Sequence, residues 1–140
     1  MDNHPTFHTP LTLTYVDGRM WRLAEAFTYE STVHGDRCLT VPADFLTDFA
    51  SIPRFFWRLL PPTGIYGKAA VIHDYLYHTP GLFWLTRMQL KGNPGQICRR
   101  YADDIFFEAM GVLGVGWLTR HTLYWAVRRF GGAAYKGTSR

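Results

Sequence analysis

Hydrophobic and polar residues alternate along the first third of the chain, which is the pattern of half-buried β-strands. In the segment LTLTYV (11–16) the larger side chains share one face and threonines occupy the other. The Asp-Gly pair at 17–18 predicts a hairpin, because both residue types tolerate positive φ. The segment 20–30 is then interpreted as the return strand, interrupted at Glu25, and RCLTV (37–41) as a third strand. The pattern predicts a small N-terminal antiparallel sheet of about three strands.

After this sheet the hydrophobic period changes to that of amphipathic helices. Four helices are predicted, over about 51–60, 64–78, 94–113 and 117–130. The first and third begin at a capping residue followed by proline in the first turn, and the last ends at a pair of glycines. Strands followed by helices indicate the α+β class, with the sheet packed against a C-terminal bundle of about four helices.

Composition narrows the class of protein. The chain of 140 residues is short enough for a single α+β domain over 1–140, and it is 47% hydrophobic and 16% aromatic. The formal net charge is +4, without a dense basic stripe or a known binding module, so no nucleic-acid binding is expected. No apolar run approaches the length of a membrane-spanning helix, and the first ten residues lack the charge and apolar core of a signal peptide. We therefore expect no membrane insertion and no signal peptide.

Two cysteines, Cys38 and Cys98, lie far apart without a metal-binding spacing, and we interpret them as free, largely buried thiols in a reducing compartment. The aromatic residues outnumber what a small core needs. We expect most of them in the core or at its rim. A cluster near Phe83-Trp84 is a candidate for an exposed surface that binds a partner.

The segment KAAVIHDYLYH (68–78) places His73 and Asp74 side by side in an apolar helix. Neighbours on a helix point about 100° apart, so these two side chains cannot face one small site together. Asp74 and His78 share a face and could pair or jointly hold a cation. A metal site generally needs at least three protein ligands, so further ligands must come from other segments.

Asp48 and Asp103 are the candidates for these further ligands. Asp48 lies in a loop between a strand and a helix, where functional groups often occur. Asp103 shares an apolar helix face with Phe106 and Met110, so its carboxylate should be buried and must be paired. Arg99, four residues earlier, is one candidate partner for that carboxylate.

Arg54 is another candidate partner, because its planar guanidinium suits a carboxylate in a tight site. Together His73, Asp48, Asp103 and Arg54 form either a buried polar network that fixes the fold or a site that acts on a ligand, and the sequence leaves both alternatives open. The pair Asp104/Glu108, by contrast, is expected to be an ordinary solvated pair of carboxylates.

Three segments carry a resemblance to a known family: residues 41–77, which include TDFASIPR and HDYLY, then RRYADDIFFEAM (99–110) and LYWAVRRFGGAAY (123–135). They resemble the domain-of-unknown-function family numbered 1353, small proteins encoded mainly by tailed bacteriophages and prophages. The positions that match its polar pattern are Thr47, Asp48, Ser51, Pro53, Arg54, His73, Asp74, Ala102, Asp103 and Arg128. His78 and Asp104 lie outside that pattern, which weakens the idea of a cation between Asp74 and His78.

The resemblance implies a genomic setting and no established activity. The first expectation is a phage-encoded structural or accessory protein, such as a tail or baseplate component, located in the virion or the infected-host cytoplasm. Its partners would be other phage proteins or copies of itself, and a structural polar network would then include Ser51, Asp74 and Arg128.

The alternative is a metal-dependent hydrolase that acts on the bacterial cell envelope. There His73 with Asp48 or Asp103 would ligate a divalent metal, one carboxylate would act as base, and Arg54 would stabilise the developing oxyanion. Outside this alternative the sequence favours no particular cofactor. A third expectation is an inhibitor of a host defence protein. It agrees with the size of the chain and the phage setting, but no particular residues support it.

Overall fold

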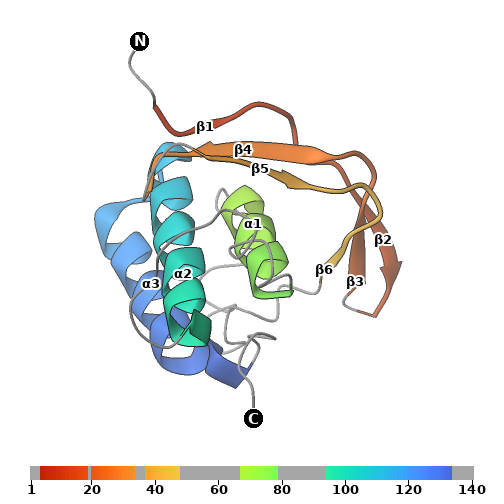
Figure 1. Ribbon diagram of the computed structural model, residues 1–140. Coiled ribbons are helices and arrows are strands. Elements are labelled where there is room, and N and C mark those ends of the chain that lie inside the picture. Colours follow the sequence, from red (N-terminus) through yellow and green to blue (C-terminus); the bar gives the residue numbers. More distant parts are fainter. Residues whose placement is uncertain (1–3, 19, 34–36, 48–66, 79–93, 134–140) are drawn as a thin grey trace.

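The computed structural model describes residues 4–18, 20–33, 37–47, 67–78 and 94–133. Within these residues, six short strands precede three α-helices in chain order (Figure 1). The strands are β1 (Thr6–Phe7), β2 (Leu13–Asp17), β3 (Met20–Leu23), β4 (Phe27–Ser31), β5 (Arg37–Val41) and β6 (Leu46–Thr47). The helices are α1 (Gly67–His78), α2 (Pro94–Val112) and α3 (Trp117–Phe130), and α3 continues into the short 3-10 helix η3 (Gly131–Ala133). The α+β class is confirmed.

The strands form two antiparallel sheets, so the expectation of one sheet with about three strands is wrong. One sheet has the order β1-β4-β5 and the other has the order β2-β3-β6. The Asp-Gly hairpin joins β2 and β3 as predicted, with Gly18 at a φ of 57°.

The expected return strand over 20–30 splits into β3 and β4, which belong to different sheets. The break falls at residues 24–26, where three consecutive side chains are exposed and the alternation is lost. Where the break begins, the Leu23 amide donates to the Phe45 carbonyl at 3.0 Å, and the Ala24 amide donates to the Thr12 carbonyl at 2.9 Å. These two bonds lie at the end of the β2-β3-β6 sheet, and the chain then enters the second sheet.

The described residues contain three α-helices, rather than the bundle of about four that was expected. The helix expected over 51–60 lies outside the described residues. α2 and α3 agree with their predicted ranges to within a residue, and α1 covers the described part of the second predicted helix. Gly131 caps the end of α3, where its amide donates to the Val127 carbonyl. Within the described part of the chain, no helix has the length and apolar character needed to cross a membrane.

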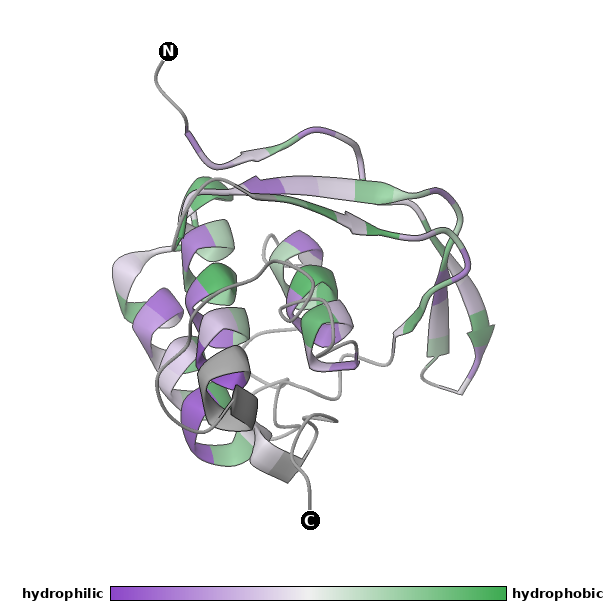
Figure 2. Ribbon diagram, viewed as in Figure 1, coloured by the Kyte–Doolittle hydropathy of each residue, from purple (hydrophilic) through white to green (hydrophobic). Residues whose placement is uncertain are grey.

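α1 is the central element of the core. β4 and β5 pass over it, while α2 packs beside it and α3 packs on α2 (Figure 1). Figure 2 shows hydrophobic residues over much of α1, and eight of its side chains are buried. Phe27 and Tyr29 on β4 and Phe106 on α2 belong to the same hydrophobic cluster. Because α1 is covered from several sides, its polar residues His73 and Asp74 lie inside the molecule.

The prediction of largely buried thiols is wrong for Cys38, which is exposed on β5. Residue 38 pairs with Glu30 in the ladder, opposite to the face that carries the buried Leu39 and Val41. The alternation of side chains along the strand therefore places the Cys38 thiol on the outer face. The Cys98 side chain lies outside the described residues.

Candidate functional site

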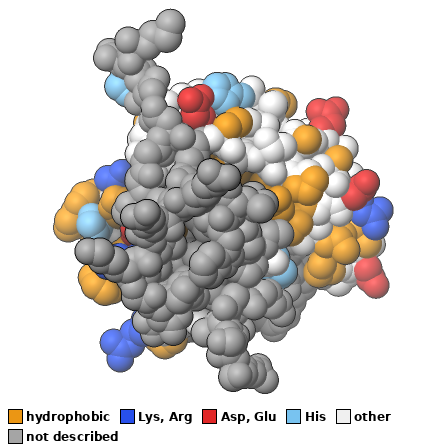
Figure 3. Space-filling view, in the orientation of Figure 1, with side chains coloured by type: hydrophobic (Ala, Val, Ile, Leu, Met, Phe, Trp, Pro, Cys, Tyr) orange, Lys and Arg blue, Asp and Glu red, His pale blue; other side chains and the backbone are white. Residues whose placement is uncertain are grey.

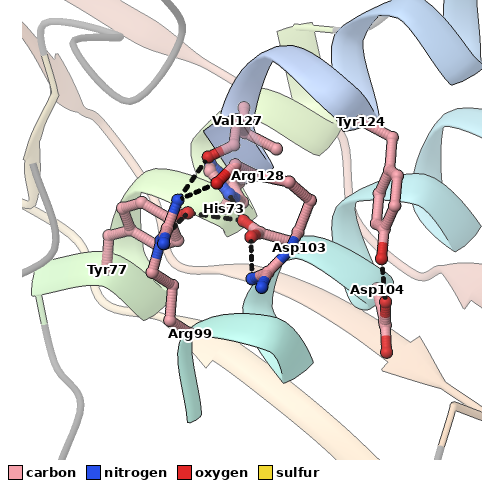
Figure 4. A network of polar contacts seen from close by, with 8 residues as sticks. All are labelled: His73, Tyr77, Arg99, Asp103, Asp104, Tyr124, Val127 and Arg128. Atoms are coloured by element: carbon pink, nitrogen blue, oxygen red, sulfur yellow. Dashed lines mark hydrogen bonds and ion pairs between the residues drawn. The ribbon is translucent and has the colours of Figure 1, made fainter. Parts of the chain in front are cut away.

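The His73 imidazole is buried at the contact between α1 and α2. Its Nε2 lies 2.6 Å from Oδ1 of Asp103 on α2. Tyr77, one helical turn after His73, donates its hydroxyl to the same oxygen at 2.5 Å. Sequence reasoning missed Tyr77, although the i, i+4 spacing from His73 could have found it. Figure 4 shows both α1 side chains directed toward Asp103.

The second Asp103 oxygen binds a residue of the third helix. Arg128, in the last turn of α3, donates Nη1 to Oδ2 at 2.8 Å. The carboxylate is fully buried and both of its oxygens accept hydrogen bonds, so the requirement for a paired Asp103 is confirmed. The carboxylate of Asp103 therefore holds α1, α2 and α3 together at one point. We call His73, Tyr77, Asp103 and Arg128 the Asp103 network.

Arg99 does not bind Asp103, and this candidate pairing is wrong. Its Nη2 donates to the backbone carbonyls of Val127 at 2.8 Å and Arg128 at 2.5 Å. Its Nε donates to the Tyr77 hydroxyl at 3.3 Å. Long side chains on a helix lean toward its N-terminus, so Arg99 points away from a residue one turn later. The guanidinium instead neutralises the negative end of α3.

The surroundings of Asp103 shift the pKa values of the groups in the network. Burial alone would raise the pKa of Asp103, but the hydrogen bond and charge of His73, with the hydrogen bonds from Tyr77 and Arg128, lower it overall. Burial raises the pKa of Tyr77, and the nearby Asp103 carboxylate raises it further. Burial would lower the pKa of Arg128, yet its contact with Asp103 raises it. The carboxylate is therefore held as an anion and the tyrosine as a neutral donor.

One nitrogen of His73 has no hydrogen-bond partner among the described residues. Because ionised Asp103 can only accept, Nε2 of His73 carries the proton, and the atom without a partner is Nδ1. The Tyr77 and Phe106 rings lie 4.1 and 4.7 Å from the His73 ring, measured between centroids. The imidazole is thus held by aromatic packing as well as by Asp103.

Asp74 points away from the Asp103 network, which confirms that neighbours on α1 serve different sites. Its Oδ2 accepts a hydrogen bond from Thr47 Oγ1 at 2.6 Å, joining α1 to β6. Nδ1 of His78 lies 2.7 Å from the Asp74 carbonyl oxygen and 3.5 Å from Oδ1. Asp74 and His78 are therefore close, as their spacing predicted.

Asp48, Ser51 and Arg54 lie outside the described residues, so their place relative to His73 stays a prediction. Of the candidate set, the structure brings together His73, Asp103 and Arg128. In the described ranges, no group of three or more histidine, cysteine or acidic residues could hold a metal. A metal at Asp103 would have to displace donors that already occupy both oxygens.

Glu108 forms a second polar cluster that sequence reasoning missed, and the expectation of a solvated carboxylate there is wrong. Its Oε1 accepts from the Tyr29 hydroxyl at 2.6 Å and from Ser31 Oγ at 2.8 Å. Its Oε2 accepts from Thr32, through the amide at 3.1 Å and the hydroxyl at 2.8 Å. Tyr29 and Ser31 alternate on the inner face of β4, and this alternation was the available signal.

Large apolar side chains are exposed along α3. Trp117, Leu118 and Trp125 are 66%, 72% and 66% exposed. Figure 3 shows hydrophobic side chains at the left edge of the view, where α3 lies, beside histidine and basic side chains. The cluster expected near Phe83-Trp84 lies outside the described residues. We call Trp117, Leu118 and Trp125 the α3 apolar face.

These features define a small α+β protein whose three helices meet at a buried carboxylate and whose last helix is apolar on the outside. The chain belongs to the family described as protein of unknown function (DUF1353), whose model matches residues 21–127. The uncharacterized protein y4jT of Sinorhizobium fredii (strain NBRC 101917 / NGR234) is 35% identical over 97 residues. That match covers 65% of this chain and 23% of the relative, so the chain spans only a small part of the relative's length. No solved structure matches the chain.

Proposed function

We propose that the chain is a phage-encoded structural or accessory protein, such as a tail or baseplate component, that acts by binding other phage proteins or copies of itself. The observation that carries this proposal is the α3 apolar face, where two tryptophans and a leucine are about two-thirds exposed or more. Exposed apolar clusters on small proteins commonly mark interaction sites.

The two tryptophans of the α3 apolar face lie on one side of the helix, with His121 between them. Trp117, His121 and Trp125 follow at intervals of four residues, so they lie in one row. The Trp117 and His121 rings are 4.4 Å apart between centroids, and Leu118 lies next to this row. Tryptophan is enriched among the residues that dominate binding energy at protein interfaces. The face therefore has the composition of an interface centre.

The Asp103 network supports a binding role more than the hydrolase alternative. The two described members of the proposed catalytic set, His73 and Asp103, are fully buried and bonded to each other. Such a pair fixes the packing of helices, whereas a hydrolase needs its base within reach of the substrate and water. A divalent metal belongs to the hydrolase alternative and is not part of the binding role proposed here.

Quantitative mass spectrometry of purified phage particles tests the proposed function. Wild-type protein should occur in a fixed copy number per particle, and Leu118→Asp should lower that number by at least about tenfold. Thr12→Asp is the control, because it places the same charge at an exposed position beside β2, across the molecule from α3 (Figure 1). Absence of the wild-type protein from particles, or equal incorporation of Leu118→Asp, would overturn the proposal.

A further inference from the structure

α3 carries projecting apolar side chains at its start and an apolar pocket further along. Trp117 and Leu118, in its first turn, are 66% and 72% exposed. The pocket, of about 400 Å³, opens between α2 and α3, and His121, Tyr124 and Trp125 form its α3 wall. This volume lies within the usual range for a binding pocket, so a large side chain can enter it. The same helix therefore offers both a projection and a space that can receive one.

We propose that a second copy of this chain covers the α3 apolar face, with the two α3 helices antiparallel about a two-fold axis near His121. The inference rests on the proposed function, because it commits to one of the partners named there. Trp117 of each copy would enter the pocket of the other copy, and Leu118 would pack beside Trp125. Both copies would then use the same surface, which is the isologous type of interface.

The tryptophans are placed symmetrically about His121. Trp117 lies four residues before His121, and Trp125 lies four residues after it. When a helix packs against an inverted copy of itself, residues at equal distances on the two sides of the axis face each other. Trp117 of one copy therefore faces the pocket wall at Trp125 of the other copy, and the reverse contact forms at the same time.

The pocket suits an uncharged ring as its occupant. Its exposed lining is mostly apolar. Each oxygen of Glu108 already accepts two hydrogen bonds from within the chain, so an incoming ring takes no bond away from it. The Phe107 and Tyr124 rings meet at 72°, and the Tyr124 and Trp125 rings meet at 73°. Rings in these orientations present both faces and edges, which an indole can contact favourably.

The basic residues of α3 also permit this pairing. Arg129 is exposed and lies eight residues after His121, so the two copies of Arg129 would lie at opposite ends of the interface. Their separation along the helices would be about 24 Å, at which salt screens the repulsion. Arg120, next to the axis, places its guanidinium carbon 4.7 Å from the Phe107 ring centroid of its own copy. Antiparallel packing also brings opposite ends of the two helix dipoles together.

The area of the α3 apolar face is sufficient for a weak, specific dimer. Its three side chains are about two-thirds exposed or more, and two of them are tryptophans. With the pocket rims, we expect the two copies together to bury about 1,000 Å², the lower limit for specific interfaces. An interface of this size predicts a Kd on the order of 10 µM.

Sedimentation equilibrium of the full chain tests this inference. Between about 1 and 300 µM, the wild-type mass should rise from that of one chain to that of two. Trp117→Ala should weaken dimerisation by at least about tenfold, because it removes the side chain that enters the pocket. Tyr15→Ala is the control, because it removes an aromatic side chain that is 57% exposed on β2, away from α3 (Figure 1). A monomer throughout, or equal dimerisation of the two variants, would overturn the inference.

NMR of a dimer mixed from isotope-labelled and unlabelled copies tests the antiparallel arrangement. Contacts between copies should join Trp117 of one copy to Tyr124 and Trp125 of the other. A parallel pair would instead join Trp117 to Trp117. That result, or contacts between copies that leave out α3, would overturn the arrangement.

The failure of this inference is distinguishable from the failure of the proposed function. A monomeric chain that is incorporated into particles, and whose Leu118→Asp variant is not, would overturn the dimer and support another phage protein as the partner. A dimer that is absent from particles would support the pairing and overturn the virion role.

Discussion

Nε2 of His73 and Oδ1 of Asp103 lie 2.6 Å apart, although 30 residues separate them in the chain. Both side chains are fully buried, so neither can exchange its partner for water. Removing such groups from water costs free energy, which their mutual hydrogen bond and those from Tyr77 and Arg128 to Asp103 offset. The pair therefore fixes how α1 lies against α2, and its integrity should determine whether the helices pack correctly.

Asp103→Asn should destabilise the protein by about 3 to 5 kcal/mol, because it removes the charge that Arg128 and His73 face. The free energy of unfolding in urea measures this loss. Asp44→Asn is the matched control. Asp44 is exposed, and asparagine tolerates its positive φ of 69°, so its stability should change by less than about 0.5 kcal/mol. Equal losses in both variants would contradict a special role for the buried carboxylate.

The stability that Asp103 provides should disappear in acid. Its pKa is lower in the folded protein than in the unfolded chain, so its contribution is present above the unfolded pKa and is lost as the pH falls. The loss should begin near pH 4, the usual value for aspartate. Unfolding experiments across this range should find the difference between wild type and Asp103→Asn shrinking below about pH 4. A difference that stays constant would contradict the lowered pKa.

Glu108→Gln should destabilise the protein by about 1 to 3 kcal/mol. The NH2 of glutamine can only donate, whereas each oxygen of Glu108 accepts two hydrogen bonds, so the two donors at one oxygen, on β4 or on Thr32, lose their acceptor. Thermal unfolding measures the change. Glu30→Gln, at a carboxylate 40% exposed and paired only with His8 among the described residues, is the control and should have little effect. A larger effect at Glu30 would contradict this account.

Local signals in the sequence were sufficient to predict the described helices and the β2–β3 hairpin. Pro94 indicated where α2 begins, and Gly131 indicated where α3 ends. The Asp-Gly pair indicated the turn between β2 and β3. The division of the strands was not predictable in this way, because it depends on which distant segment each strand pairs with. β3, for example, pairs with β6, which lies more than twenty residues further along the chain.

The candidate site likewise has features that local sequence signals predict and features that depend on contacts between distant segments. Helical geometry was sufficient to predict that His73 and Asp74 have different partners, and the apolar face of its helix was sufficient to predict that Asp103 is buried. Asp103 pairs with Arg128 and not with Arg99 because of the way α3 packs on α2. Residue spacing within a single helix does not predict such a contact. The hydrogen-bond partners of Glu108 are likewise set by a contact between β4 and α2.

Gly131 lies against the Asp103 network, and a larger residue there should disturb Tyr77. A Cβ atom at Gly131 would lie 2.9 Å from the Tyr77 hydroxyl oxygen, closer than such atoms normally approach. The backbone at Gly131 is helical, with φ −75° and ψ −9°, so alanine causes no strain of its own. Gly131→Ala should therefore cost about 1 to 3 kcal/mol, through displacement of the hydroxyl from Asp103.

A double-mutant cycle with Tyr77→Phe identifies that cause. Without the hydroxyl, the added methyl group has more room and no hydrogen bond to break, so Gly131→Ala should cost less in the Tyr77→Phe background than in wild type. Gly116→Ala is the control, because nothing lies within 4 Å of a Cβ atom there. It should not interact energetically with Tyr77→Phe. Strictly additive effects of Gly131→Ala and Tyr77→Phe on the free energy of unfolding would show that the glycine does not act through the Asp103 network.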